Sequence, residues 1–576
     1  MPRSRRLEVR VLGAPRIVQG DRTAAGPRGR KSWAVLTRLA LSSRPLARTE
    51  LSALLFPDAE DPLGALRWAL AEMRRALGRE DLFRGDPLEL PPDLAIDVRA
   101  LGGATEEAVR VSEDAGELLA GWEFPGCPEF ESWLTAERSR AAARVEAHLR
   151  AAAMRQLASG NTEAAVRLAG RAVAANPLDE ALHELLVRSL ARAGDRAAAE
   201  AQVLRAERLL ADSLGTPPSP SLRAALEDGP PPRRSPVPAS AATAGVLIES
   251  GKAAMAAGAY DAGIQSLRRA IVHSEGTQRV EALLRLGSAL VHALRGRDEA
   301  GAVYLHEAAQ RADEAGETAM AVTALRELAF VDIQAGRVAT AEERIREAEQ
   351  LAGDDDALRA GVWAMQGMFL ADRANHAEAS RAFRASIDAA ERAGDRRQAA
   401  WSRALLGRSA LLTGELAGAA RLLAESIETC RQERWLAFLP FPMAMAAEVA
   451  LARNERPEVA ERLLQESFAL GCELGDPCWE ALGASGLARV ALARGDPAAA
   501  WEHAFDGHQR CIRHPDRYVW IEGWVLLTLL EAAQASGRRA EAADARRALT
   551  ELAMRTEQPD LLSRLESGAA GKRRQG

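Results

Sequence analysis

A recurring turn pattern in the C-terminal half constrains the fold more than any other feature of the sequence. From about residue 245 to 565, a Gly or Asn marks a turn, and small residues that open a helix follow two to five positions later. The turn residues, at steps of 38 to 42 positions, are Gly258, Gly296, Gly336, Asn375, Gly414, Asn454, Gly495 and Gly537. Because a single helix pair cannot bury its apolar face alone, this near-constant step predicts eight units stacked into a right-handed superhelix with a concave groove.

Each predicted turn is followed by a small residue that lets adjacent helices approach closely. These residues are Ala262, Ala300, Ala341, Ala379, Ala419, Ala460, Ala500 and Ala542. Seven of the 11 tryptophans fall in the same region: Trp363, Trp401, Trp435, Trp479, Trp501, Trp520 and Trp524. The favoured interpretation is that they fill the space between helices, and the alternative is that they line a groove for a peptide or another effector.

A second helical repeat precedes this array, between residues 108 and 228. Segments 160–165 and 194–199 are alike and lie 34 residues apart, which is the period of tetratricopeptide repeats. Asn176-Pro177 is expected to end the helix between them. Prolines are then frequent from Gly229 to Ala244, so we expect a stiffened linker there.

The first 100 residues predict a small mixed domain. Alternating apolar and charged residues indicate short strands in residues 7–24, and apolar periodicity indicates helices over residues 30–41 and 48–56. Asp61-Pro62 is a strong start signal for a third helix. Three later segments are expected to pair as a terminal hairpin: residues 82–83, 88–90 and 96–98. Strands, three helices and a hairpin are the layout of a winged helix-turn-helix.

The third helix has one apolar edge and one arginine edge. Its core residues, at helical spacing, are Leu66, Leu70, Met73 and Leu77. Arg67, Arg74 and Arg75 fall on another face, and arginines on a helix can bond guanine edges or phosphates in a major groove. The alternative is that this arginine face is exposed to solvent and binds nothing. Trp68 has two open roles, which are DNA contact and packing inside the domain or against the preceding strands.

Further basic residues suit contacts to the phosphate backbone. Arg28, Arg30 and Lys31 stand at the start of the first helix, and Arg48 stands at the start of the second, where helix N-termini also attract anions. Arg84 is expected at the tip of the wing. The predicted DNA-binding residues are therefore Arg30, Lys31, Arg48, Arg67, Trp68, Arg74, Arg75 and Arg84.

The distribution of charge is typical of an N-terminal region that binds nucleic-acid phosphates and a remainder that binds protein. Residues 1–100 contain 18 Arg and Lys and 13 Asp and Glu, which gives a net charge of +5. Since the net charge of the whole chain is −6, residues 101–576 have a net charge of −11. No 18-residue apolar run or N-terminal apolar segment occurs, so a cytoplasmic protein without membrane association is expected. The five cysteines are scattered and are expected to be reduced thiols.

No motif indicates catalysis. The Gly-Lys pairs Gly251-Lys252 and Gly571-Lys572 are not followed by Ser or Thr, so no Walker A loop exists. His503, His508, Cys511 and His514 cluster in one repeat, but their spacing matches no common zinc pattern and spreads over much of a helix. We expect neither an enzyme nor a bound cofactor or metal.

The first 228 residues resemble the SARP-type bacterial transcriptional activators, which join a winged helix to a bacterial transcriptional activator domain (BTAD). Matching stretches occur in the order of the family: residues 51–58, 65–77, 97–98, 128–137, 176–183 and 208–220. The sequence departs from the family at Phe56, where Trp is usual, at Ala47-Arg48, where a Ser or Thr cap is common, and in a wing without its usual aromatic residue. The later array resembles tetratricopeptide (TPR) arrays in general.

Together these features predict a mainly α protein with four segments. They are a winged helix (α+β) at residues 1–101, a BTAD at 108–228, a linker at 229–244, and a TPR-like α-solenoid at 245–565. The resemblance implies a sequence-specific activator that binds double-stranded promoter DNA at direct repeats and contacts RNA polymerase or self-associates. The array would sense a peptide or protein signal. The competing hypothesis is an interaction scaffold whose winged helix does not bind DNA specifically.

Overall fold

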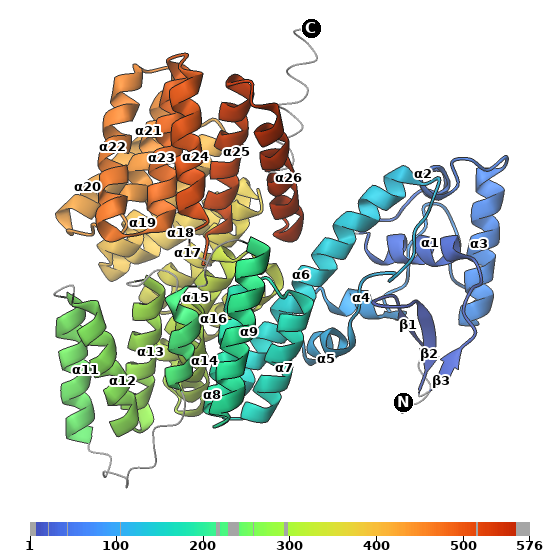
Figure 1. Ribbon diagram of the computed structural model, residues 1–576, viewed down its shortest axis with the longest axis horizontal. Coiled ribbons are helices and arrows are strands. Elements are labelled where there is room, and N and C mark those ends of the chain that lie inside the picture. Colours follow the sequence, from blue (N-terminus) through green and yellow to red (C-terminus); the bar gives the residue numbers. More distant parts are fainter. Residues whose placement is uncertain are drawn as a thin grey trace. The chain divides into compact units, whose positions relative to one another are not determined.

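The computed structural model shows a mainly helical protein with a small N-terminal sheet (Figure 1). It describes residues 7–20, 22–42, 44–103, 105–214, 219–228, 241–256, 259–292, 298–513, 516–559 and 561. The chain divides into two compact units, residues 1–149 and 150–576. This division falls within one long helix, α6 (Pro128–Ala158), and the four segment limits expected from the sequence stay predictions.

The sheet of the first unit has the strand order β3-β2-β1-β4. Strands β1 (Leu7–Arg10), β2 (Arg16–Gln19) and β3 (Arg22–Ala24) are antiparallel neighbours, as the alternating pattern predicts. Strand β4 (Ala95–Ile96) pairs with β1 in the parallel direction.

The expected terminal hairpin does not form among the described residues, so that prediction is wrong. Ile96 lies opposite Val9 in β1, and the backbone of Leu88 exchanges two hydrogen bonds, of 2.9 and 2.7 Å, with Leu46. Both partners precede the third helix in the sequence. The apolar segments after that helix thus pair with earlier parts of the chain rather than with each other.

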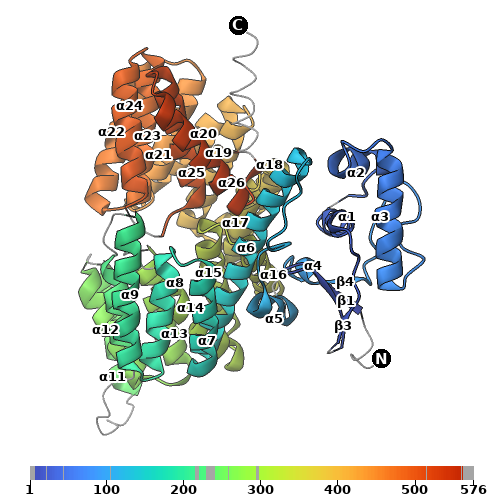
Figure 2. The same cartoon turned by 45° about the vertical axis from the view of Figure 1, so that its right-hand side comes forward.

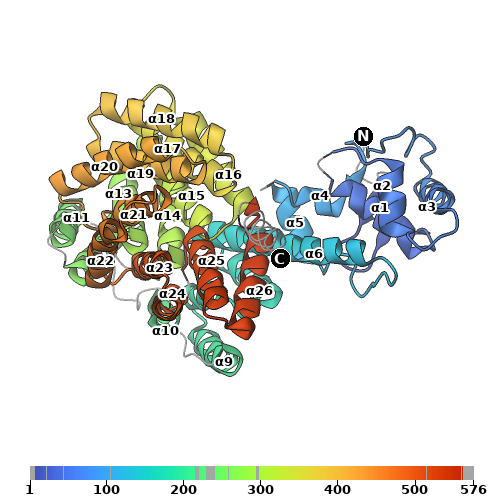
Figure 3. The same cartoon turned by 90° about the horizontal axis from the view of Figure 1, so that it is seen from above.

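Three helices of the first unit pack together: α1 (Arg30–Ala40), α2 (Arg48–Leu55) and α3 (Pro62–Leu77) (Figure 3). Asp61 caps α3 as predicted, since its side chain accepts the Gly64 N–H at 2.8 Å and Pro62 occupies the first helical position. Helix α2 has no side-chain cap of its own. Instead Asp86 Oδ1, from the loop after α3, accepts the Arg48 N–H at 2.9 Å.

In the remainder of the first unit, hydrogen bonds join α4 to the sheet and α6 to the loop that precedes it. It contains α4 (Asp97–Ala100), α5 (Glu106–Asp114) and the N-terminal part of α6. The buried Asp97 carboxylate accepts the N–H groups of Val11 and Leu12, at 2.9 to 3.0 Å, and so ties α4 to the strand end. Arg138 of α6 donates to the carbonyls of Leu118 and Trp122, both at 2.9 Å.

The second unit begins with the helices of the shorter repeat. They are α7 (Thr162–Ala175), α8 (Glu180–Arg192), α9 (Arg196–Leu214), α10 (Pro220–Ala224) and the 3₁₀ turn η2 (Ala225–Asp228). Gly160 and Gly194 take the positive φ values, 80° and 83°, of the two corresponding turns. Helix α7 ends before Asn176-Pro177, as predicted.

Eight helix pairs make up the described array, as the turn period predicts, and consecutive helices lie side by side (Figure 2). The first four pairs are α11 (Ala241–Ala256) with α12 (Tyr260–His273), α13 (Gly276–His292) with α14 (Asp298–Glu314), α15 (Thr318–Gln334) with α16 (Val338–Ala352), and α17 (Asp356–Asp372) with α18 (His376–Ala393). The others are α19 (Arg396–Leu412) with α20 (Leu416–Gln432), α21 (Pro440–Ala452) with α22 (Pro457–Leu474), α23 (Pro477–Ala493) with α24 (Pro497–Cys511), and α25 (Val519–Ala535) with α26 (Arg539–Arg555).

The turn and small-residue predictions hold over most of the array. Six predicted turn residues, from Gly336 to Gly537, lie between the two helices of a pair. Five of the alanines are completely buried: Ala341, Ala379, Ala419, Ala460 and Ala500. Ala262 is exposed, and its neighbour Gly263 is the buried residue, so this assignment was off by one position.

Several sequence predictions lie outside the described residues. These are the turns at Gly258 and Gly296, residues 229–240 of the expected linker, His514, and the N-terminal and C-terminal ends. None of the described helices is long and apolar enough to cross a membrane.

Candidate nucleic-acid interface

Helix α3 separates its apolar and basic faces as the sequence indicates. Leu66, Leu70, Met73 and Leu77 are at most 2 % exposed. On the other side, the Arg67 side chain is 64 % exposed and pairs with Asp61 at 3.1 Å, and Arg75 is also exposed. Arg74 is half-buried. The helix therefore presents two exposed guanidinium groups and one half-buried group away from its core.

Trp68 lies on this outer face and is 58 % exposed, so it does not fill the core. Its ring passes close to the start of α1, since a Cβ built at Gly29 would lie 3.4 Å from it. The structure thus brings Trp68 together with the N-terminus of α1.

The N-terminus of α1 carries a feature that sequence reasoning missed. Glu72, on α3, accepts the Arg28 N–H at 2.7 Å, the Gly29 N–H at 3.2 Å and the Ser32 hydroxyl at 2.7 Å. Helix α1 has no side-chain cap of its own. The carboxylate of Glu72 thus occupies the place where a helix N-terminus would attract an external anion.

Glu72 is charged in the folded protein. Burial raises the pKa of its carboxyl, but the hydrogen bonds from Ser32, Arg28 and Gly29 outweigh burial and bring the pKa below its usual value. Its position inside an otherwise basic helix was the only available signal in the sequence, because its partners lie 40 to 44 residues away.

The remaining predicted contacts are arranged in two groups. At α1, Arg30 is exposed with its guanidinium 5.8 Å from the ring of Trp122, and the ammonium of Lys31 lies 4.9 Å above the ring of Phe56. At α2, the guanidinium of Arg48 donates to the carbonyls of Phe83 and Gly85, both at 2.9 Å, and Arg84 is exposed beside them. Arg48 therefore holds the loop after α3 in place.

A cavity of about 400 Å³ opens in the second unit. The side chains that line it come from α13, α15, α17, α19, α21 and α23, from the turn before α21, and from Tyr518 before α25. These are the first helices of successive pairs, so the cavity lies on one side of the array. Its size is within the range of ligand-binding pockets.

One wall of the cavity is a continuous run of aromatic rings. Trp435 stacks on Phe438 at 4.8 Å between ring centroids, Phe438 lies 5.7 Å from Phe441, and Phe441 lies 5.6 Å from Trp479. Trp401 continues the wall on the other side of Phe438, at 6.5 Å. Met365, Met368 and Leu405 add apolar surface.

The seven array tryptophans therefore divide into those that line the cavity and those that pack elsewhere in the array. Trp401, Trp435 and Trp479 line the cavity. Trp520 and Trp524 stack on each other at 5.4 Å, below the guanidiniums of Arg408 and Arg489. Trp363 and Trp501 lie against Arg359 and Arg538, respectively.

A charged cluster also lines the cavity. Glu327, on α15, is 7 % exposed and accepts from His292 Nε2 at 2.5 Å and from Arg326 Nη2 at 2.9 Å. Burial raises the pKa of Glu327, but His292 and Arg326 more than offset burial and hold the pKa at about 2. The cavity thus joins an aromatic wall to an ionised, paired carboxylate.

Tyr518 connects the cavity to a second buried ion pair. Its hydroxyl donates to Asp372 Oδ2 at 2.9 Å and accepts from Arg408 Nη1 at 2.8 Å. Arg408 also donates to Asp372 Oδ1 at 2.6 Å, and its side chain is completely buried. Three helices, α17, α19 and α25, are therefore joined at one point behind the cavity.

Residues 95–228 match the bacterial transcriptional activator domain (BTAD). The match covers the parallel strand β4, helices α4, α5 and α6, and the short helical repeat. It includes Asp97, Arg138 and both turn glycines of that repeat. No curated protein matches the chain.

Three solved structures illustrate partial similarities of fold. EmbR from Mycobacterium tuberculosis, in complex with a low-affinity phosphopeptide, is 20 % identical over 43 % of this chain and 72 % of its own, with a TM-score of 0.30. A Rap protein complexed with competence and sporulation factor is 11 % identical over 66 % of this chain and 98 % of its own, with a TM-score of 0.44. A signal transduction ATPase with a TPR sensor, from Pyrococcus horikoshii, is 13 % identical over 87 % and 65 %, with a TM-score of 0.33.

These similarities are too distant to carry an argument about function. The matched domain, the small N-terminal sheet with its three helices, and the paired helices of the array carry the assignment instead. The chain contains a bacterial transcriptional activator domain at residues 95–228, together with a small N-terminal sheet with three helices and a C-terminal TPR-like array of paired helices.

Proposed function

We propose that the protein is a sequence-specific, DNA-binding transcriptional activator that reads the major groove with α3. The observation that carries this proposal is the outer face of that helix, on which Arg67, Trp68, Arg74 and Arg75 stand opposite a buried apolar edge. Arginine side chains on a helix can bond guanine edges bidentately. Trp68 would be covered by DNA in the complex.

The phosphate contacts would come from the predicted residues outside α3, which are Arg30, Lys31, Arg48 and Arg84. Because Glu72 already engages the N–H groups before α1, contacts there must come from the side chains of Arg30 and Lys31. Arg84 is exposed and can reach a backbone, whereas Arg48 would act mainly by holding the loop that carries Arg84. All of these contacts are independent of base sequence and should weaken with salt.

The BTAD would support self-association or contact with RNA polymerase, as the family implies, and the array would receive a peptide or protein signal. The cavity supports the sensing role, since it combines an aromatic wall with a charged edge. A peptide could place an apolar side chain against Phe438 and Trp435, and its polar backbone near Gln398 and Arg397.

Selection of genomic fragments by the full-length protein, at two salt concentrations, tests the proposal. Enrichment of a repeated motif that weakens steeply with salt is the expected result. The competing scaffold hypothesis predicts no enrichment and retention of protein partners by the array.

A further inference from the structure

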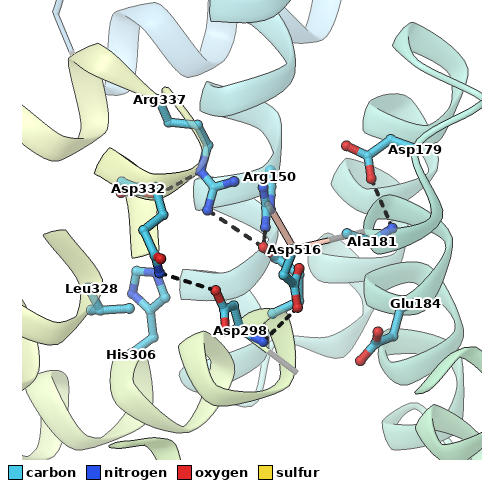
Figure 4. Close-up of polar contacts among 12 residues, drawn as sticks. Arg150, Asp179, Ala181, Glu184, Asp298, His306, Leu328, Asp332, Arg337 and Asp516 are labelled. Atoms are coloured by element: carbon cyan, nitrogen blue, oxygen red, sulfur yellow. Dashed lines mark hydrogen bonds and ion pairs between the residues drawn. The ribbon is translucent and has the colours of Figure 1, made fainter. Parts of the chain in front are cut away.

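The short segment Asp516–Tyr518, which leads into α25, lies between two buried sites of the second unit. Asp516 is partly buried, and its Oδ2 accepts the Asp298 N–H, at the start of α14, at 2.9 Å. Arg150 of α6 lies beside it, and Asp179, which caps α8, and Glu184 of α8 lie nearby (Figure 4). The Asp516 carboxylate is thus bonded to the start of α14 and lies within the electrostatic influence of charged residues from α6 and from α8 and its N-terminus.

Charged groups of both signs surround Asp516. Asp179 and Glu184 repel its carboxylate, whereas Arg150 attracts it. Burial, together with these two acids, raises the pKa of Asp516 to about 7. Arg150 is itself paired with the buried Glu299 of α14, so it is shared between two acidic groups. A displacement of Asp516 would therefore alter the negative charge that Arg150 meets beside Glu299.

This site belongs to a larger buried network of ion pairs. Arg337 pairs with Asp332 at 2.7 Å and lies 3.6 Å from Glu299, and Arg344 pairs with Asp332 at 2.8 Å. Such networks are costly to bury and are strongly destabilised when one partner is lost. Arg150 connects this network in α14, α15 and α16 to α6.

Tyr518, two positions after Asp516, stands at the other site. It lines the cavity, is 5 % exposed, and is bonded through its hydroxyl to Asp372 and Arg408. Two residues of extended chain span only about 7 Å. A displacement of the Tyr518 ring by an occupant of the cavity must therefore be passed on to Asp516 or absorbed by Arg517.

We propose that Asp516–Tyr518 is a transmission segment, which couples occupancy of the aromatic cavity to the position of Arg150 on α6 and of α8. The proposal rests on the proposed sensing role of the cavity and adds the structural path from the cavity to α6 and α8. In this route the Tyr518 ring moves with the cavity wall. Asp516 then loses its hydrogen bond to Asp298, and its electrostatic interaction with Arg150 changes. Its repulsion of Glu184 changes as well, which displaces α8. Because α6 is one helix from Pro128 to Ala158, a change at Arg150 acts on an element that also belongs to the DNA-binding unit.

Hydrogen exchange of the full-length protein tests this route without knowledge of the natural signal. The variant Ala437→Trp places a large side chain at the cavity and leaves the carbonyl of residue 437 free to accept from Trp479 Nε1, as it does now at 3.0 Å. We expect amide exchange in residues 150–158 and 180–192 to change by about fivefold or more, the lower end of typical coupling between sites. The change should disappear when Asp516→Asn is added and persist when the exposed Asp544→Asn is added instead.

Two results would overturn the proposal. One is unchanged exchange in both regions of Ala437→Trp, and the other is a change of the same size with and without Asp516→Asn. If Ala437→Trp does not fold, Tyr518→Phe replaces it. This variant keeps the ring in the cavity but removes the bonds to Asp372 and Arg408. Its effect on amide exchange should likewise disappear when Asp516→Asn is added.

Affinity for the selected DNA motif, measured on the same variants, separates this inference from the proposed function. Altered exchange with unaltered DNA affinity would leave the transmission segment in place and refute regulation of DNA binding by the cavity. Altered DNA affinity without altered exchange in residues 150–158 would support sensing and refute this route.

Discussion

Glu72, in the middle of α3, accepts the backbone N–H of Arg28 at 2.7 Å and thereby closes the N-terminus of α1 from another helix. The same carboxylate holds Gly29 and Ser32, so the orientation of α3 is fixed relative to the start of α1. Trp68, one turn earlier on α3, then stands beside Gly29. An acidic residue thus orients a helix whose exposed face is basic.

Glu72→Gln should destabilise the first unit by about 1.5–3 kcal/mol, the usual range for a hydrogen-bonded charged group that is lost from a buried site. Because the pKa of Glu72 is lowered on folding, the stability that it contributes is full above the pKa of the unfolded chain and falls as pH drops through the folded pKa. Urea unfolding of wild type and variant at neutral pH, and again in acid, measures this difference. Glu80→Gln, on an exposed neighbour, is the control, and an equal loss in both variants would contradict the role of Glu72.

Arg74→Ala should relax base specificity at one position of the selected motif, at a cost of about 1–3 kcal/mol in binding, if Arg74 reads a guanine. Fluorescence anisotropy with the motif, with single-base variants and with random DNA measures the effect. The exposed Arg381→Ala, on α18, removes the same charge far along the chain and should leave affinity unchanged. An equal loss on specific and random DNA would assign Arg74 to phosphate instead.

Glu327→Gln should destabilise the array near neutral pH, by at most about 3 kcal/mol, since a group with its folded pKa at about 2 gains its stability from the ionised form. The folded pKa lies below the usual value, so this contribution is full above about pH 4.5 and is lost as pH falls toward 2. The difference in unfolding free energy between wild type and variant should therefore shrink in acid. A difference that stays constant with pH would show that His292 and Arg326 do not stabilise the charge.

Asp372→Asn should cost about 3–5 kcal/mol in unfolding free energy, because it leaves the completely buried guanidinium of Arg408 without its charged partner. Tyr518→Phe removes only a neutral hydroxyl and should cost less. Guanidinium unfolding of both variants, with exposed Asp388→Asn as control, gives the order. Equal losses for Asp372→Asn and Tyr518→Phe would mean that the charge pair is not the main stabilising contact.

Local and periodic features of the structure could be predicted from the sequence, and long-range partners could not. The cap at Asp61, the buried edge of α3, the repeat turns and the buried alanines follow from helical periodicity, turn chemistry and capping preference. These signals act within a few residues or recur at a fixed step. The fold class, as a result, was predicted correctly.

The missed features join residues far apart in the sequence. Ile96 and Leu88 are apolar and extended, as the hairpin prediction required, but pattern alone does not say which strand they pair with. Glu72 looked like a surface charge of a helix, and Asp516 finds its partner 218 residues away. For the candidate site, sequence placed the basic residues of the three helices on the right elements, but Arg84 lies in a loop and not in a hairpin. It also could not show that Arg48 and the N-terminus of α1 are engaged within the protein.

The central claim is that the outer face of α3 reads DNA sequence. Genomic selection with the full-length triple variant Arg67→Ala, Arg74→Ala, Arg75→Ala tests it most directly. A second triple variant, Arg381→Ala, Arg384→Ala, Arg421→Ala, removes the same charge from exposed positions on α18 and α20. The account predicts that the first variant enriches no motif while the second enriches the wild-type motif. Enrichment of that same motif by both variants would contradict it.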